Sequence, residues 1–138
     1  MNGVFLDTNV LLYSISRSPC ELAKREHAIA LLDRDDCALS VQVLQEFYVQ
    51  ATRPSRSNPL PHETAVGLIR AWGRFRVQET TTAVLYAAFE IKARYGFSYW
   101  DAALIAAARA MGCATLYTED LSHGQIIEDL SIVDPFRV

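Results

Sequence analysis

The amino-acid sequence predicts an α/β sandwich, in which a central, mostly parallel sheet of about five strands carries helices on both faces. Short apolar runs alternate with longer segments of helical periodicity, and this alternation is typical of consecutive βαβ units. Ser, Asp and Gly residues stand where these segments meet, as expected for helix caps and turns. The 138 residues contain neither an internal repeat nor a low-complexity linker, so we expect one domain over residues 1–138.

The first predicted strand leads directly into a helix. Residues 4–6 form an apolar run that stops at Asp7, Thr8 and Asn9, which are residue types that favour turns and helix caps. A helix over residues 10–16 is therefore expected to follow the strand.

A second strand and two longer helices are predicted before the middle of the chain. Residues 21–32 repeat apolar side chains at the spacing of one helical face. Residues 37–39 form a second apolar run, and Ser40 can cap a helix over residues 41–51. Residues 53–61 contain three prolines among small polar residues, so this segment is predicted to be a loop.

The second half is predicted to contain three helices and three strands. Gly96 can end a helix as the residue after its last turn, and Ser98 can cap the next helix, which Gly112 closes. We expect helices over residues 62–72, 81–94 and 99–111, and strands at residues 75–77, 114–117 and 131–133.

The composition excludes several classes of protein. Cys20, Cys37 and Cys113 are odd in number and scattered, which argues against a disulfide framework and a thiolate zinc site. No apolar stretch approaches the roughly 18 residues of a membrane span, and no cleavable leader is recognised, so we expect a cytoplasmic protein without a membrane partner. The net charge of −3 does not indicate nucleic-acid binding, although eleven of the thirteen basic residues are Arg, which suits phosphate contacts.

Four acidic residues are expected to meet at one edge of the sheet. Asp7 and Asp120 follow predicted strands, Asp101 lies in the first turn of a helix, and Glu46 lies about two turns into another. In an open parallel sheet, ligands bind outside the carboxyl ends of the strands. A lone Asp in such a place is more often a helix cap or a surface charge, but the coincidence of four carboxylates favours a shared metal site.

The residue types at this predicted site suggest phosphodiester chemistry. Clustered carboxylates raise one another's pKa unless a cation neutralises them. A site made of oxygen ligands, without His or Cys, selects a hard cation such as Mg²⁺ or Mn²⁺. Such an ion can activate a water and offset charge on a phosphorane-like transition state. The expected reaction is hydrolysis of a phosphodiester by a metal-activated water.

Four segments of the chain resemble the sequence motifs of the PIN-domain ribonucleases, in the same order and over essentially the whole chain. They are VFLDTNVLLY at residues 4–13, SVQVLQEFY at 40–48, YWDAALIAAA at 99–108 and LYTEDL at 116–121. Within that family, the chain is most similar to the VapC toxins of bacterial toxin–antitoxin pairs.

The resemblance implies a PIN-like fold and an endoribonuclease that acts on RNA. It also implies a homodimer and a cognate antitoxin whose tail would cover the active-site groove. Carried over motif by motif, the catalytic metal ligands are Asp7, Glu46, Asp101 and Asp120, with Glu119 as an alternative to Asp120, and the supporting polar residues are Asn9 and Thr118.

Two other functions remain open at this point. A receiver-like phospho-acceptor domain has a similar size and an acidic Mg²⁺ pocket, but it usually has a Lys after the last strand, whereas Lys24 and Lys92 lie in predicted helices. A non-catalytic PIN-fold module that binds RNA or protein is the other alternative. The residues do not distinguish transfer, ribosomal or messenger RNA as the substrate, nor one bound ion from two.

Overall fold

The computed structural model describes residues 3–137 and confirms the predicted α/β architecture. The sheet in these residues has six strands, namely β1 (Val4–Leu6), β2 (Cys37–Ser40), β3 (Arg76–Gln78), β4 (Thr115–Tyr117), β5 (Ile126–Ile127) and β6 (Leu130–Val133). Their order is β3-β2-β1-β4-β6-β5. All neighbours pair in parallel except β5, which pairs antiparallel with β6. The central strand β1 is completely buried, as expected for a sheet covered on both faces.

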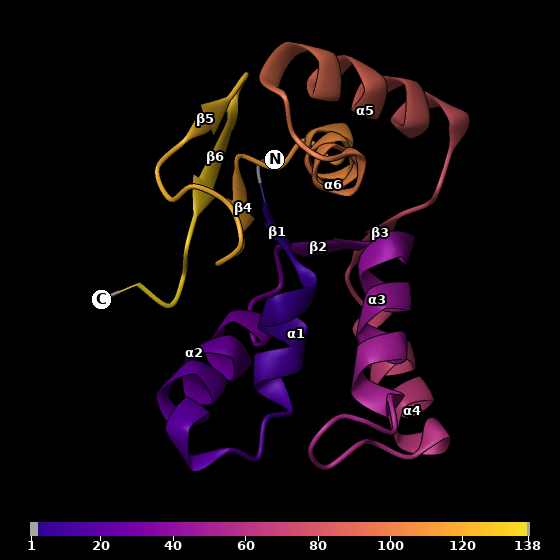
Figure 1. The fold of residues 1–138 in the computed structure, drawn as a ribbon, viewed down its shortest axis with the longest axis vertical. Coiled ribbons are helices and arrows are strands. Elements are labelled where there is room, and N and C mark those ends of the chain that lie inside the picture. The colour runs from indigo at the N-terminus through magenta and orange to yellow at the C-terminus, as the bar shows by residue number, and fades with distance from the viewer. Residues whose placement is uncertain (1–2, 138) are drawn as a thin grey trace.

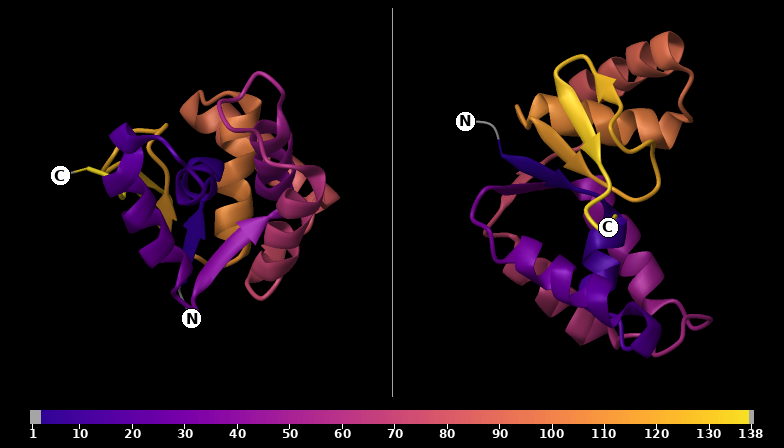
Figure 2. Two further views of the ribbon diagram at one scale, coloured as in Figure 1. Left: turned by 90° about the horizontal axis from the view of Figure 1, so that it is seen from below. Right: turned by 90° about the vertical axis from the view of Figure 1, so that its left-hand side faces the viewer.

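Six α-helices surround the sheet in the described residues, together with a short 3-10 helix, η1. They are α1 (Thr8–Ser14), η1 (Pro19–Glu21), α2 (Leu22–Leu32), α3 (Val41–Thr52), α4 (His62–Trp72), α5 (Thr82–Tyr95) and α6 (Tyr99–Ala110). Figures 1 and 2 show α1 to α4 on one side of the central strands, with α5 and α6 on the other.

The two-layer arrangement of the helices follows from the strand order. The chain moves from β1 to β2 to β3 in one direction across the sheet, and then returns to β4 on the other side of β1. Because parallel crossovers are right-handed, reversing the direction transfers α5 and α6 to the opposite face. The order therefore switches between β1 and β4, and the carboxyl ends of these two strands are the place where an open α/β sheet binds ligands.

Most predicted elements agree with the structure to within two residues. The first helix begins at Thr8 rather than at residue 10, because Asp7 acts as its N-cap. Ser40 and Ser98 cap α3 and α6 as predicted, each accepting a backbone hydrogen bond, and Gly96 ends α5 with a φ of 78°. The two-residue strand β5 was not predicted, because a hairpin strand this short has no apolar periodicity.

The interior is apolar on both faces of the sheet. On one face, the ring of Phe47 on α3 contacts Trp72 on α4 edge-on, with 4.8 Å between ring centroids. On the other, seven consecutive residues of α6, from 102 to 108, are buried. Five of these are Ala, and their small side chains allow α6 to lie close to the sheet and beneath α5.

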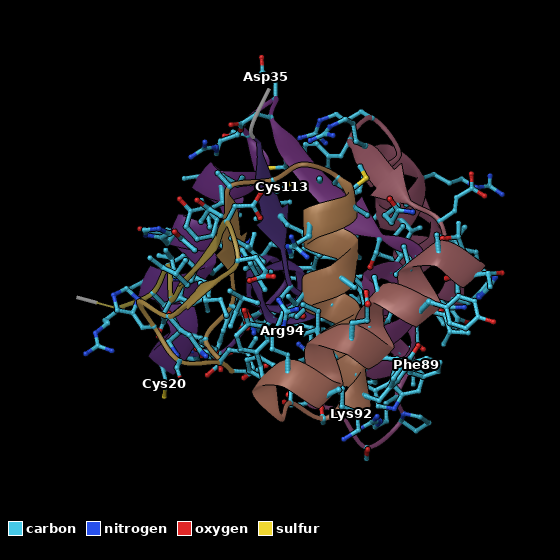
Figure 3. All side chains as sticks on the ribbon, turned by 90° about the horizontal axis from the view of Figure 1, so that it is seen from above. Cys20, Asp35, Phe89, Lys92, Arg94 and Cys113 are labelled. Atoms are coloured by element: carbon cyan, nitrogen blue, oxygen red, sulfur yellow. The ribbon has the colours of Figure 1, made fainter. Side chains whose placement is uncertain are left out.

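The cysteines behave as the sequence indicated. Cys37 and Cys113 are buried free thiols, and Cys20 is exposed. Figure 3 shows Cys20 and Cys113 on different parts of the molecule. None of the helices between residues 3 and 137 has the length and apolar character needed to cross a membrane.

Candidate metal and catalytic site

A small cavity of about 140 Å³ lies at the carboxyl ends of β1 and β4, and the four predicted carboxylates all contribute to its wall. Asp7 comes from the end of β1, Glu46 from the middle of α3, and Asp101 from the first turn of α6, while Asp120 follows β4. The other lining residues are Thr8, Asn9, Leu12, Gln42, Gln50, Trp100 and Leu104. The fold thus brings together side chains that are separated by up to 113 positions in the sequence.

Asp7 is held in place by the backbone and by a neighbouring strand end. Its Oδ1 accepts a hydrogen bond from the backbone N–H of Thr8 at 2.7 Å, and this bond caps α1. Its Oδ2 accepts a hydrogen bond from the Thr118 hydroxyl at 2.8 Å. Because both carboxylate oxygens are bonded from different elements, the plane of the Asp7 side chain is fixed before any ligand arrives.

Asn9 and Thr118 connect Asp7 to Asp120. The Asn9 amide Nδ2 donates to Asp120 Oδ2 at 3.1 Å and to Thr118 Oγ1 at 3.3 Å. Thr118 Oγ1 also accepts from the backbone N–H of Asp120 at 3.1 Å. The two residues that the motifs suggested as supporting polar groups therefore lie between two of the four carboxylates.

Burial dominates the electrostatics of Asp7. The side chain is 9% exposed, and its burial raises the pKa from 3.8 to about 6. The hydrogen bonds from Thr118 and Thr8 oppose this rise in pKa, while the charges of Asp120 and Glu46 add to it. A cation in the cavity would reverse the effect of these charges, because it favours the ionised form of each carboxylate.

The chemistry of the donor set fits a hard divalent cation. Every polar side chain that lines the cavity, apart from the Trp100 indole, offers an oxygen. Within residues 3–137, the buried oxygens Thr8 Oγ1 and Asn9 Oδ1 have no hydrogen-bond partner, which leaves unused acceptors in the cavity wall. A buried acceptor without a partner is costly, and an ion or its water ligands would satisfy it.

Among residues 3–137, the carboxylates around the cavity form no closed cage for an ion. In the described part of the chain, no three His, Cys, Asp or Glu side chains are arranged to hold one ion together. Mg²⁺ retains several waters and is usually held by one or two carboxylates plus substrate phosphate. An open set of carboxylates around a cavity is therefore compatible with Mg²⁺, and it leaves room for a phosphate.

The two acidic residues that follow β4 have different surroundings. The Glu119 carboxylate accepts hydrogen bonds from the Tyr13 hydroxyl and from Lys24 Nζ, the latter at 3.1 Å, and Glu119 does not line the cavity. Asp120 does line it and receives the Asn9 amide. The geometry therefore favours Asp120 over Glu119 as the fourth carboxylate.

Gln42 and Trp100 are among the residues of the cavity wall that sequence reasoning missed. Gln42 Nε2 donates to Glu46 Oε1 at 3.1 Å and to the backbone oxygen of Trp100 at 3.4 Å, so it joins α3 to the start of α6. Gln42 stands four residues before Glu46, a spacing at which helical side chains meet. Trp100 is 66% exposed, and a Trp beside a candidate ligand was the signal that could have identified it.

Comparisons with known proteins give a matching family and several chains of similar fold. Residues 4–126 match the family model described as PIN domain. A chain of a toxin–antitoxin complex from Klebsiella pneumoniae is similar with a TM-score of 0.73 and 17% identity, over 99% of this chain and 100% of that one. VapC20 of Mycobacterium tuberculosis, described as a sarcin-ricin loop cleaving toxin, gives a TM-score of 0.67 and 23% identity, over 86% and 90% of the two chains.

A third structure, the DNA-bound VapBC from Salmonella typhimurium, gives a TM-score of 0.65 and 22% identity, over 98% and 99% of the chains. No curated protein matches the chain. At these identities the structural matches show a shared fold.

Proposed function

This chain belongs to the PIN-domain family, and from that premise we propose that it is a metal-dependent endoribonuclease. In this proposal, it hydrolyses RNA phosphodiester bonds with a water activated by Mg²⁺ or Mn²⁺. The observation that carries the proposal is the convergence of Asp7, Glu46, Asp101 and Asp120 on one small cavity. Such a set of carboxylates repels phosphate unless a cation is bound between them, so a nuclease built on it requires a metal.

In this proposal, some side chains of the cavity hold the metal and its water ligands, and others position those side chains. Asp7 and Asp120, linked through Asn9 and Thr118, would hold the metal from the sheet side. Asp101 and Glu46 would hold its water ligands from α6 and α3. When bound, Mg²⁺ or Mn²⁺ lowers the pKa of a water and offsets negative charge on the phosphate. Gln42, bonded to Glu46, would keep that carboxylate turned toward the cavity.

We further propose that this nuclease is the toxin of a toxin–antitoxin pair, acting in the cytoplasm as a homodimer. The fold is shared with chains solved in a toxin–antitoxin complex from Klebsiella pneumoniae and in VapBC from Salmonella typhimurium. The cognate antitoxin would then cover the groove over the cavity with its tail. Growth arrest on induced expression, relieved by co-expression of the cognate antitoxin, is the expected result in cells.

One observation favours a non-catalytic PIN-fold module as the second candidate. The carboxylates in residues 3–137 do not form a ready cluster for one ion, as a scaffold without metal would show. The receiver-like alternative has no such support, because neither Lys24 nor Lys92 lines the cavity.

Metal binding and RNA cleavage measured together distinguish the two candidates. Mn²⁺ is titrated into the protein by calorimetry, and labelled RNA is incubated with the same samples with and without EDTA. We expect wild type to bind Mn²⁺ and to cleave, Glu46→Gln to bind more weakly, and Asp101→Asn to lose cleavage while keeping its circular dichroism spectrum. Absence of Mn²⁺ binding in wild type would favour the module, and full cleavage by Asp101→Asn would contradict the assigned site.

A further inference from the structure

A second, larger groove of about 420 Å³ lies directly beside the carboxylate cavity. Its wall is formed by the ends of β2 and β3 and by parts of α3, α5 and α6. Gln42 and Trp100 line both the groove and the cavity, so the two spaces are neighbours that share these residues. A ligand bound in the groove would therefore lie next to the cavity with the four carboxylates.

The lining of this groove is mostly apolar, and its polar groups are uncharged apart from one carboxylate. It includes the amides of Gln42, Gln45 and Gln78, as well as hydroxyls from Ser40 and from the segment between β3 and α5. Glu79 is its one charged residue among the described ones, and no Lys or Arg of the described chain lines it. Such a surface does not attract phosphate, but it can exchange hydrogen bonds with a neutral group that carries both donors and acceptors.

Trp100 forms an exposed aromatic surface between the groove and the cavity. Two thirds of the side chain is exposed, although large aromatic residues usually bury most of their area. Its ring contacts Tyr99 edge-on at 5.0 Å between centroids, and its backbone carbonyl accepts the Gln42 amide. An exposed ring beside a proposed site for RNA cleavage is a platform on which an unstacked base can lie.

The remaining exposed aromatic residues of this region lie outside the groove. Tyr86 and Phe89 on α5 continue a row of ring contacts to Tyr99, at 6.1 and 5.9 Å between centroids. Neither lines the groove, and Figure 3 shows Phe89 at the surface of α5. These residues therefore offer a control, since they are aromatic and exposed but do not line the groove.

We propose that this groove binds the base of a nucleotide adjacent to the scissile phosphate, with the base stacked on Trp100. The amide of Gln78 and the hydroxyls of the neighbouring segment would bond the polar edge of that base and so determine which base is preferred. The base must be unpaired, because a paired base has its edge and both faces covered. This inference rests on the proposed function and adds the residues that select the cleavage sequence.

The first test measures cleavage of single-stranded RNA with Mn²⁺ present. Randomised, end-labelled oligoribonucleotides are cut by wild type, the cleavage sites are sequenced, and one preferred oligomer is used for kinetics. Base stacking is lost in Trp100→Ala, so we expect its KM to rise about 5- to 150-fold, which corresponds to ~1–3 kcal/mol per stacked base. Trp100→Phe retains a ring and should restore most of the affinity, while Phe89→Ala should leave KM unchanged.

Two further substrates connect the effect to the base itself. In one substrate, the base next to the cut is removed to leave an abasic sugar. The KM of wild type for this substrate should rise by about the same factor as the KM of Trp100→Ala rises on intact RNA. Trp100→Ala should show no further rise in KM on the abasic substrate. Gln78→Leu should change the base preference at that position in the sequenced products. Unchanged KM in Trp100→Ala together with unchanged preference in Gln78→Leu would overturn the inference while leaving the nuclease proposal intact.

A fluorescence measurement gives a readout that does not depend on cleavage. The protein has two Trp residues, and Trp72 is buried, so quenching by acrylamide reports mainly on Trp100. We expect the preferred oligomer to protect the fluorescence of Asp101→Asn from acrylamide, with no such protection in Asp101→Asn/Trp100→Ala. A wild type that cuts no RNA would overturn the nuclease proposal, yet protection of Trp100 by RNA would still support the groove.

Light scattering on the same variants tests the competing occupant of this face, which is a second copy of the chain. If Trp100→Ala and Phe89→Ala both convert a dimer into monomers with equal losses of cleavage, the aromatic row is a contact between copies and the base-binding inference is wrong. An unchanged molar mass in Trp100→Ala, with the KM effect present, supports it.

Discussion

Replacing Asp7 by Asn should stabilise the metal-free protein at neutral pH, even though it removes a candidate metal ligand. Burial raises the pKa of Asp7 from 3.8 to about 6, so the folded state binds this proton more tightly than the unfolded state does. At about 1.36 kcal/mol per pKa unit, the ionised side chain lowers the free energy of unfolding by at most about 3 kcal/mol. The hydrogen bond from Thr118 to Oδ2 is weakened in the variant, which costs about 1 kcal/mol.

The sign of this effect depends on pH in a defined window. Below pH 3.8 the Asp7 carboxyl is protonated in both the folded and the unfolded state, so removing its charge adds no stability. Between 3.8 and about 6 the unfolded state ionises first, and the stability of wild type falls; above about 6 the loss is complete. We therefore expect the free energy of unfolding of Asp7→Asn to exceed that of wild type by about 2 kcal/mol at pH 8 and by less than about 1 kcal/mol at pH 5.

Guanidinium unfolding in EDTA, followed by circular dichroism at pH 5 and pH 8, measures this difference. Asp120→Asn is the matched control: it removes the same charge from the same cavity, but Asp120 is exposed, so its stability should change by less than about 0.5 kcal/mol. Added Mn²⁺ should stabilise wild type more than Asp7→Asn, because an ion that binds the folded state alone shifts the equilibrium. An Asp7→Asn variant that is less stable than wild type at pH 8 in EDTA would refute the reasoning.

Three further outcomes are expected. Glu119→Gln should keep most RNA cleavage, because the Glu119 carboxylate is bonded to Tyr13 and Lys24 outside the cavity. Asp120→Asn should lose cleavage in the same assay. Equal losses of cleavage in the two variants would contradict the choice of Asp120. Phe47→Ala removes a fully buried ring and should lower the free energy of unfolding by about 3–5 kcal/mol in denaturant titrations. Ser98→Ala removes the α6 cap and should cost about 1 kcal/mol by the same measurement; a neutral result would show that the cap bond is not stabilising.

The elements were predictable because their signals are local. A cap such as Ser40 or Ser98 acts on a backbone N–H three residues away, and an apolar run such as residues 4–6 is visible without any neighbour. The start of α1 was placed two residues late, because Asp7-Thr8-Asn9 was read as a turn before the helix when Asp7 is itself the cap. The short strand β5 escaped prediction, since its two residues are defined by pairing with β6.

The candidate site was predictable as a set of residues but not as a shape. The positions of Asp7, Asp101 and Asp120 next to strand ends or helix starts follow from the same local signals, and Glu46 was predicted from its place about two turns into the helix that follows the second strand. Sequence alone left Glu119 and Asp120 as alternatives, because adjacent residues in a turn can point either way. Glu119 is bonded instead to Tyr13 and Lys24, which lie 106 and 95 positions away in the sequence, and these bonds hold its carboxylate outside the cavity.

The sequence by itself thus determined the class of the fold and the order of its elements, and it proposed Asp7, Glu46 and Asp101 with either Asp120 or Glu119 as the carboxylates of the site, since periodicity, capping and residue chemistry all act over a few residues. Only the tertiary structure gave the strand order that brings β1 beside β4, the position of Asp120 rather than Glu119 in the cavity wall, and the groove beside that cavity. These features depend on contacts between residues far apart in the chain. Such contacts are set by how the layers pack, and packing is a property of the whole fold rather than of any segment.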